Sequence, residues 1–340
     1  MAGPSPVSGR GGRDLMGPVL VTGAGGFIGA NLVRALFRAD AEVHALVRPS
    51  TDLWRLEGVR WQLVLHLADV RDAGAVRDVV AAVRPDVVYN LAVGRARPEN
   101  PVSRQESMDT SLLGARALLD AIAMHPVRRV VHLGSHLEYA ARERALREDA
   151  PIAPGSFRGT VKATETAQWL HAARMRSIPL TVLRPFHVYG PWEAPTRLIP
   201  TAIRCAMSGT DMPIVDSETR RDPVFVEDVV EACLLAATRE LARGEVFNVG
   251  SGEEWSTADM VNAVAKAVGR PIGLRRGAYR SHTTDSPHSR ADVTKAARLL
   301  GWRPGHSFHQ GLERTVPWYL ARRGSERPRA TTADQSGLPA

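Results

Sequence analysis

Three glycines near the start of the chain have the spacing of a phosphate-binding turn. Gly23, Gly26 and Gly29 directly follow a short apolar run, and the helical pattern begins at 28, just before the last of them. At this spacing the first glycine makes a tight turn, the second lets backbone N–H groups approach a pyrophosphate, and the third lets helix and strand pack closely. The first N–H groups of the helix, from Phe27 and Ile28 onward, point toward the phosphates. The sequence therefore predicts a bound dinucleotide.

Residues after the second and third apolar runs indicate which dinucleotide binds. Arg48 and Ser50 follow the run 42–47, where a carboxylate usually holds the ribose 2′-hydroxyl of NAD. A guanidinium suits a 2′-phosphate instead, and Ser50 adds a hydrogen-bond donor. We therefore predict NADP(H) as the cofactor, with Asp69 beside the adenine amino group. The alternatives are a solvated Arg48 and a helix N-cap role for Asp69.

The elements that must position these residues alternate in type. Apolar strand-like runs and helical patterns follow one another through the first half, a rhythm that predicts an α/β Rossmann fold with a doubly wound parallel sheet. The expected strands are 18–21, 42–47, 62–65, 87–91, 129–133 and 180–184. The expected helices are 28–38, 73–83, 108–124, 162–175, 198–207, 226–238, 256–268 and 295–300.

The pattern also predicts how the chain is divided. Prolines interrupt the later part, which we expect to form a smaller, mainly C-terminal α/β substrate domain. The predicted NADP-binding domain is 17–186 with a return segment at about 222–250. The predicted substrate domain comprises 187–221 and 251–322. The Gly-, Pro- and Ser-rich segment 1–16 and the segment 323–340 are expected to be disordered tails.

Composition excludes several classes of protein. Of the 340 residues, 44% are hydrophobic and 24% charged, as in a soluble enzyme, and there is no run of about 18 apolar residues that would predict a membrane span. The net charge of +8 comes from scattered arginines, so no nucleic-acid partner is expected. Cys205 and Cys233 lie in apolar helical patterns and predict buried free thiols in a cytoplasmic protein. No metal site is predicted.

Six motifs resemble those of the extended short-chain dehydrogenase/reductases, the NAD-dependent epimerase/dehydratase group. They are 22–29, 86–92, 183–191, 221–228, 247–252 and 300–304, within a resemblance that spans residue 17 to about 320. The resemblance implies further cofactor contacts from Val70, Leu91, Ala92 and Pro185. It also implies a substrate contact from Arg221, because the arginine at this position often binds a diphosphate in nucleotide-sugar enzymes of this group.

The catalytic set of this group is Ser or Thr, Tyr and Lys, and the chain departs from it. Ser135 matches the serine that hydrogen-bonds the reacting carbonyl, and Lys162 matches the lysine that holds the nicotinamide ribose. Arg158 stands at the tyrosine position, and no tyrosine lies between Tyr139 and Tyr189. An arginine has a pKa above about 12 and does not exchange its proton, so the usual acid/base group is missing. Arg158 is instead a candidate contact for an anionic group on the substrate.

Two histidines are candidates for the missing acid/base role. His136 follows Ser135, and His187 follows the last strand of the first half, at the sheet edge where ligands bind. An imidazole titrates near neutral pH. His187 is also a candidate substrate contact. The alternatives are that the histidines only fill space or bond backbone, or that a phenol on the substrate donates the proton.

The missing tyrosine leads to our expectation of function. Without the tyrosine, the scaffold resembles an atypical polyketide ketoreductase, and this resemblance implies NADPH-dependent reduction of a ketone on an aromatic, angucyclinone-type polyketide in antibiotic biosynthesis. One alternative is a nucleotide-sugar epimerase, dehydratase or reductase, which Arg221 and the overall pattern favour and which His187 and Arg158 disfavour. The other is a non-catalytic NADP(H)-binding sensor. The protein is expected to be a monomer or a homodimer.

Overall fold

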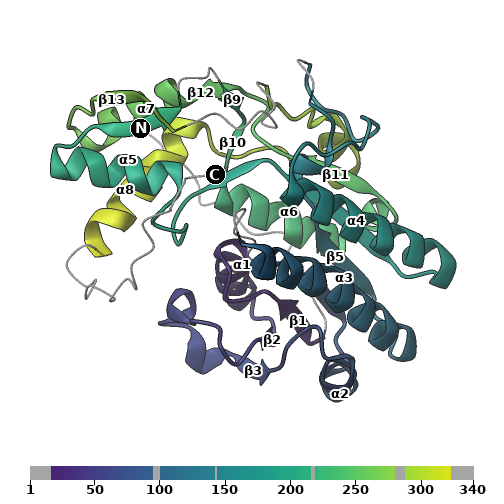
Figure 1. Cartoon of the computed structure of the whole chain (residues 1–340). Helices are drawn as coiled ribbons and strands as arrows, with labels where there is room; N and C mark the ends of the chain where they lie inside the picture. Colours follow the sequence, from purple (N-terminus) through teal and green to yellow (C-terminus); the bar gives the residue numbers. More distant parts are fainter. Residues whose placement is uncertain (1–16, 95–99, 142–143, 216–218, 280–287, 323–340) are drawn as a thin grey trace, which may run out of the picture.

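A seven-stranded parallel sheet forms the centre of the molecule (Figure 1). The structure, a computed structural model, describes residues 17–94, 100–141, 144–215, 219–279 and 288–322. The strand order is β11-β6-β5-β4-β1-β2-β3. These strands are β1 (Val19–Thr22), β2 (Val43–Val47), β3 (Val64–Leu67), β4 (Val87–Asn90), β5 (Arg129–Leu133), β6 (Leu180–Pro185) and β11 (Val246–Val249). The prediction of a doubly wound Rossmann sheet is confirmed.

Helices cover both faces of this sheet. One face packs against α1 (Phe27–Arg38) and α6 (Val226–Thr238), and the other against α2 (Ala73–Val83), α3 (Pro101–Met124) and α4 (Phe157–Arg176). Strands buried on both faces are continuous apolar runs, as the sequence of β1 shows. Each face therefore has its own hydrophobic core. Because both faces are covered by helices, a ligand can bind only at the edge of the sheet.

A smaller α/β region lies beside the carboxyl edge of the sheet (Figure 1). Its core joins three helices: α5 (Leu198–Ser208), α7 (Thr257–Val268) and α8 (Phe308–Arg322). Its strands pair two by two: β7 (His187–Tyr189) with β10 (Pro223–Phe225), β8 (Met212–Val215) with β13 (Leu274–Tyr279), and β9 (Arg220–Arg221) with β12 (Trp255–Ser256). The short helical turns are η1 (Trp54–Leu56), η2 (Arg60–Gln62), η3 (His136–Glu138), η4 (Glu240–Ala242) and η5 (Ala296–Leu300).

The main errors of the sequence-based boundaries are at helix starts and in the smaller region. α3 begins at Pro101 rather than at 108 because the Asn100 side chain accepts a hydrogen bond from Ser103 N–H and caps it. α4 begins at Phe157 rather than at 162, since Ser156 caps it in the same way. The predicted strand 62–65 was placed early, because residues 60–62 form η2 and β3 starts at 64. The seventh strand of the central sheet, β11, the short strand pairs and α8 were not predicted.

Two predictions from composition can be compared with the described residues. Cys205 and Cys233 are free and buried, as predicted. No described helix is both long enough and apolar enough to cross a membrane. The predicted tails, 1–16 and 323–340, lie outside the described residues.

Candidate functional site

The glycine turn has the shape of a pyrophosphate cradle. Gly23 has a φ of +69°, and a Cβ there would lie 2.5 Å from the Leu91 carbonyl oxygen. A Cβ on Gly29 would overlap the Gly23 carbonyl oxygen. Gly26 is the N-cap of α1 and supplies no side-chain acceptor, so the N–H groups that open the helix at Phe27 are left for a ligand. This backbone fits the phosphates of a dinucleotide.

A Gly29→Val substitution is expected to abolish measurable NAD(P) binding, because the added side chain cannot occupy space held by the Gly23 carbonyl. Gly26→Ala is a graded control, since its Cβ would lie 3.0 Å from the same oxygen and a small shift would relieve the contact. Isothermal titration with NADP⁺, together with circular dichroism to confirm folding, measures both effects. An unchanged affinity in folded Gly29→Val protein would exclude this turn as the cofactor site.

The residues predicted at the adenosine end lie at the ends of β2 and β3. Arg48 directly follows β2 and is partly exposed, and Ser50 is exposed. Asp69 binds Arg71 through both carboxylate oxygens, at 3.0 and 2.7 Å, and these bonds hold the pKa of Asp69 below its usual value. Asp72, not Asp69, caps α2, which removes the helix-cap alternative. Arg48 also lowers the pKa of Asp69 by its charge, so the two groups lie near one another.

Other predicted residues lie at the carboxyl ends of neighbouring strands. Leu91 and Ala92 follow β4, Ser135 follows β5, and Pro185 ends β6. The Ala92 N–H donates to the Thr22 hydroxyl, which ties the end of β4 to β1. Val70, after β3, is buried against Gly114 of α3. The parallel sheet brings these residues to one edge.

Ser135 is fixed by a buried ion pair. It caps η3, with its hydroxyl oxygen accepting from Leu137 N–H at 3.2 Å, and its own N–H donates to Glu138 Oε1 at 2.8 Å. Glu138 is fully buried and its Oε2 accepts from Arg184 Nε at 2.8 Å. The hydroxyl hydrogen of Ser135 remains available to a substrate oxygen, because the capping bond uses only its oxygen.

Lys162 lies beneath the same edge. Its Nζ donates to the Leu133 carbonyl at 2.7 Å and to Glu165 Oε2 at 3.0 Å. Burial raises the pKa of Glu165, while Lys162 opposes that rise. An ammonium has three N–H donors, so one remains for a cofactor ribose hydroxyl.

The tyrosine nearest to Ser135 in sequence is buried, and its hydroxyl group forms hydrogen bonds within the core. The Tyr139 hydroxyl donates to Asn248 Oδ1 at 2.7 Å and accepts from Arg184 Nη1 at 2.9 Å. Its side chain is buried, and burial raises the pKa of Tyr139 to about 12. Tyr139 therefore does not replace the missing acid/base tyrosine.

His136 and His187 come together beside Ser135, with ring centroids 4.4 Å apart. His136 Nδ1 faces the Pro185 carbonyl oxygen at 3.2 Å. A carbonyl only accepts, so Nδ1 carries the proton and Nε2 presents a bare lone pair. Burial lowers the pKa of His136 to about 4, and burial, followed by the effect of His136, holds the pKa of His187 well below its usual value. Both imidazoles are neutral at pH 7, which suits a base.

Two arginines lie near this histidine pair, and a third, exposed arginine lies near one of them. Arg197 and Arg221 both lower the pKa of His136 and of His187 by their charges. Arg197 also lowers the pKa of Arg158, after the larger effect of burial, so Arg158 belongs to the same cluster. Sequence reasoning selected Arg158 and Arg221 but missed Arg197, whose only signal was its place after a proline-rich turn. We call Arg158, Arg197 and Arg221 the arginine cluster.

Close to the cluster lies a buried carboxyl that sequence reasoning also missed. Glu193 approaches Arg197 with one oxygen, 3.8 Å from Nε, while its other oxygen is buried without a partner among the described residues. Burial raises the pKa of Glu193 to about 8, so this carboxyl is largely neutral at pH 7 and offsets little of the arginine charge. The surroundings of the histidine pair therefore favour an anionic ligand. No group of metal-binding side chains occurs among the described residues.

The comparisons with known proteins agree with this geometry. The model of the family described as "NAD dependent epimerase/dehydratase family" matches residues 19–250. The chain belongs to this family. It is therefore an NAD(P)-dependent enzyme of the epimerase/dehydratase type, as its motifs predicted. The glycine turn at 23–29, which we call the cofactor turn, lies within the matched residues. So does the carboxyl edge of the sheet that carries Ser135 and His136, which we call the catalytic edge.

Relatives in the family cover almost the whole chain. A dTDP-glucose 4,6-dehydratase of Streptomyces niveus is 28% identical, over 94% of this chain and 98% of that protein. The low-salt glycan biosynthesis protein Agl12 of Haloferax volcanii is 31% identical, over 89% and 98%. The structure of DesIV, a dTDP-glucose 4,6-dehydratase of Streptomyces venezuelae with NAD and TYD bound, aligns with a TM-score of 0.83 at 26% identity, over 92% of this chain and 99% of that one.

Proposed function

We propose that the enzyme oxidises or reduces a sugar carbon of a nucleotide diphosphate sugar. The observation that carries this proposal is that Arg197 and Arg221 lie near the His136–His187 pair, with Arg158 near Arg197. A diphosphate is the anionic part of such a substrate, and guanidinium groups bind phosphate oxygens in pairs of hydrogen bonds. The dTDP-glucose 4,6-dehydratases among the relatives support the same substrate class. We therefore propose a nucleotide sugar as the substrate in place of the aromatic polyketide expected from the sequence.

The site residues divide the chemistry between them. A bound nicotinamide supplies the acceptor or donor of hydride. Ser135 donates a hydrogen bond to the reacting sugar oxygen, and His136 Nε2 takes the hydroxyl proton as the carbonyl forms. In the reverse direction the imidazolium returns that proton. Lys162 holds the cofactor ribose, and Glu165 balances its charge.

For the cofactor we propose NADP(H), held at the 2′-phosphate by Arg48 and Ser50. An Arg48→Glu substitution is expected to lower the preference for NADPH over NADH at least tenfold, because a charge-assisted hydrogen bond contributes about 1.5–3 kcal/mol. The ratio of the two dissociation constants, from fluorescence titration, measures this. Ser50→Ala is expected to have a smaller effect. An unchanged ratio in Arg48→Glu would show that Arg48 does not bind the 2′-phosphate.

A second candidate is the reduction of an aromatic polyketide ketone with NADPH. The observation that favours it is the commitment of the Tyr139 hydroxyl to Asn248 and Arg184, which leaves the site without a tyrosine proton donor. A phenol beside the substrate ketone then donates the proton, and Ser135 orients the carbonyl. Methylation of that phenol is expected to stop turnover in this case.

Binding of dTDP-glucose to the NADP⁺-loaded protein tests the proposal. We expect measurable binding that Arg221→Ser weakens about tenfold or more, because a guanidinium–phosphate contact is lost. Arg220 is the matched control, since it is the neighbouring residue of β9 and is exposed. Equal loss in Arg220→Ser, or no binding by the parent protein, would contradict the proposal. NADPH oxidation by a phenol-flanked ketone would then support the second candidate.

A further inference from the structure

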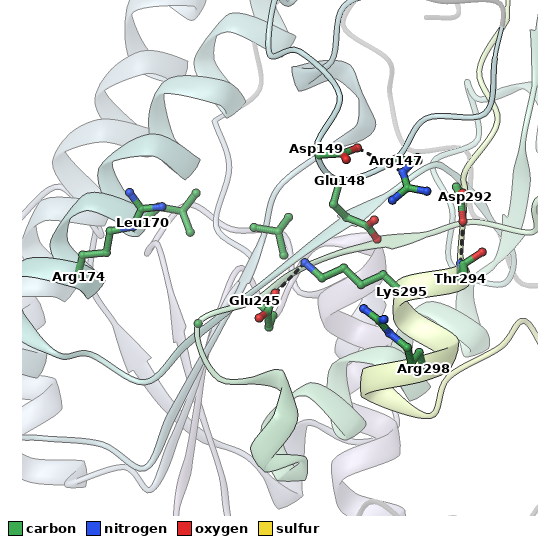
Figure 2. Close-up of a pocket in the computed structure, with 12 residues that line it drawn as sticks. Arg147, Glu148, Asp149, Leu170, Arg174, Glu245, Asp292, Thr294, Lys295 and Arg298 are labelled. Carbon is green, nitrogen blue, oxygen red and sulfur yellow. Dashed lines mark hydrogen bonds and ion pairs between the residues drawn. The ribbon is translucent and has the colours of Figure 1, made fainter.

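A pocket of about 560 Å³ lies on the far side of the catalytic edge, where β11 begins (Figure 2). Its walls come from the loop before α4, from α4 itself, from the turn before β11 and from η5. The charged residues that line it are Arg147, Glu148, Asp149, Arg174, Glu245, Asp292, Lys295 and Arg298. The volume is within the range of small-molecule sites. Neither the cofactor turn nor the arginine cluster contributes to it.

Two of the cations in this pocket have no partner among the described residues. Lys295 pairs with Glu245 at 2.7 Å, and Arg147 with Asp149 at 3.4 Å. Arg174 on α4 and Arg298 on η5 make no ion pair or hydrogen bond with any residue that the structure describes. They stand on opposite walls of the pocket (Figure 2). Two uncommitted guanidinium groups favour an anion with several acceptor oxygens, of which a phosphate is the usual example.

The pocket also contains carboxylate oxygens that can accept hydrogen bonds from the hydroxyl groups of a ligand. Glu148 Oε1 accepts from the Asn248 N–H at 2.9 Å, and Glu148 lines the pocket. One Asp292 oxygen accepts from Thr294 N–H. The remaining lone pairs suit hydroxyl donors. The combination of guanidinium and carboxylate groups therefore fits a molecule that carries both a phosphate and hydroxyl groups.

A chain of hydrogen bonds connects the pocket to the catalytic edge. From Glu148 it passes to the backbone of Asn248, whose side chain accepts from the Tyr139 hydroxyl at 2.7 Å. Tyr139 accepts from Arg184 at 2.9 Å, and Arg184 belongs to the buried ion pair that anchors Ser135. The three side-chain bonds in the middle of this chain are buried, and the two bonds at its ends are partly buried. In a site of low dielectric such linked bonds reinforce one another.

We propose that this pocket is a second ligand site, which binds a small phosphorylated sugar and acts on Ser135 through Asn248. The phosphate lies between Arg174 and Arg298, and sugar hydroxyls donate to Glu148 and Asp292. This proposal does not depend on which substrate the catalytic edge takes.

Titration of glucose 1-phosphate into the NADP⁺-loaded protein tests the site. We expect saturable binding that the double variant Arg174→Ser/Arg298→Ser weakens about 100-fold, roughly tenfold for each lost contact. Arg176→Ser is the matched control, because Arg176 lies on the same helix but binds Asp120 on α3. Arg221→Ser is expected to leave this binding unchanged, which separates the pocket from the arginine cluster. Equal affinity in the double variant would overturn the site.

Two further arms test the ligand class and the coupling. Glucose and inorganic phosphate, as separate probes, are both expected to bind at least tenfold more weakly than glucose 1-phosphate. Equal binding of either would overturn the assigned class. Hydrogen exchange of the backbone amides at 135–139 is expected to change on addition of glucose 1-phosphate in the parent protein and not in the double variant. Binding without that change would overturn the coupling to Ser135.

Discussion

A His136→Gln substitution is expected to lower the rate of hydride transfer by about 10²–10⁴, the usual contribution of a positioned acid/base group. The Pro185 carbonyl fixes the tautomer so that His136 Nε2 accepts the substrate proton. Glutamine fills similar space but has no such titratable nitrogen. Single-turnover formation of reduced cofactor measures the step. His171→Gln is the matched control, because His171 is exposed on α4.

The pH profile gives an independent check of the same residue. The pKa of His136 is lowered to about 4 in the folded enzyme, so its base form persists as the pH falls through the usual histidine range. Oxidation is therefore expected to keep its rate between about pH 5 and pH 8. A rate that fell with a pKa near 6.5 would show that a solvated histidine, and not His136, is the base.

A Glu138→Gln substitution is expected to lower the free energy of unfolding by about 3–5 kcal/mol, because it leaves the buried charge of Arg184 uncompensated. The Glu138 carboxylate accepts bonds from Arg184, from Thr166 and from the Ser135 backbone, and it is fully buried. Urea denaturation followed by circular dichroism measures the loss.

The exposed ion pair between Glu227 and Arg314 supplies the control for this substitution. Its two charged atoms are 2.7 Å apart, close to the 2.8 Å of the Glu138–Arg184 pair, but both side chains are largely exposed. Glu227→Gln is therefore expected to cost less than about 1 kcal/mol. Equal losses in the two variants would mean that burial of Glu138 contributes nothing, and that its pairing with Arg184 does not fix Ser135.

The parts of the fold that could be predicted from sequence are those that local pattern determines. Strands at the centre of a parallel sheet are buried on both faces, so β1 stands out as an apolar run. Helix starts were less predictable, because the caps at Asn100 and Ser156 lie outside the apolar pattern. α8 was missed since Pro317 stands within it and its apolar residues are few.

The same distinction applies to the site. The glycine turn is a local motif, so its residues were identified directly. The commitment of Tyr139 depends on Asn248 and Arg184, which are distant in sequence, and no local pattern shows it. Arg197 joins the arginine cluster only through tertiary packing. The change of our first choice from polyketide to nucleotide sugar follows from this cluster and from the relatives.

One measurement tests the central claim most directly: single-turnover mixing of the NADP⁺-loaded enzyme with dTDP-glucose, followed by the absorbance of the reduced nicotinamide. We predict that reduced cofactor forms in the parent enzyme. It should be lost in His136→Gln protein that still binds the sugar nucleotide. Absence of reduced cofactor in the parent enzyme, together with oxidation of NADPH by a phenol-flanked aromatic ketone, would contradict the proposed function.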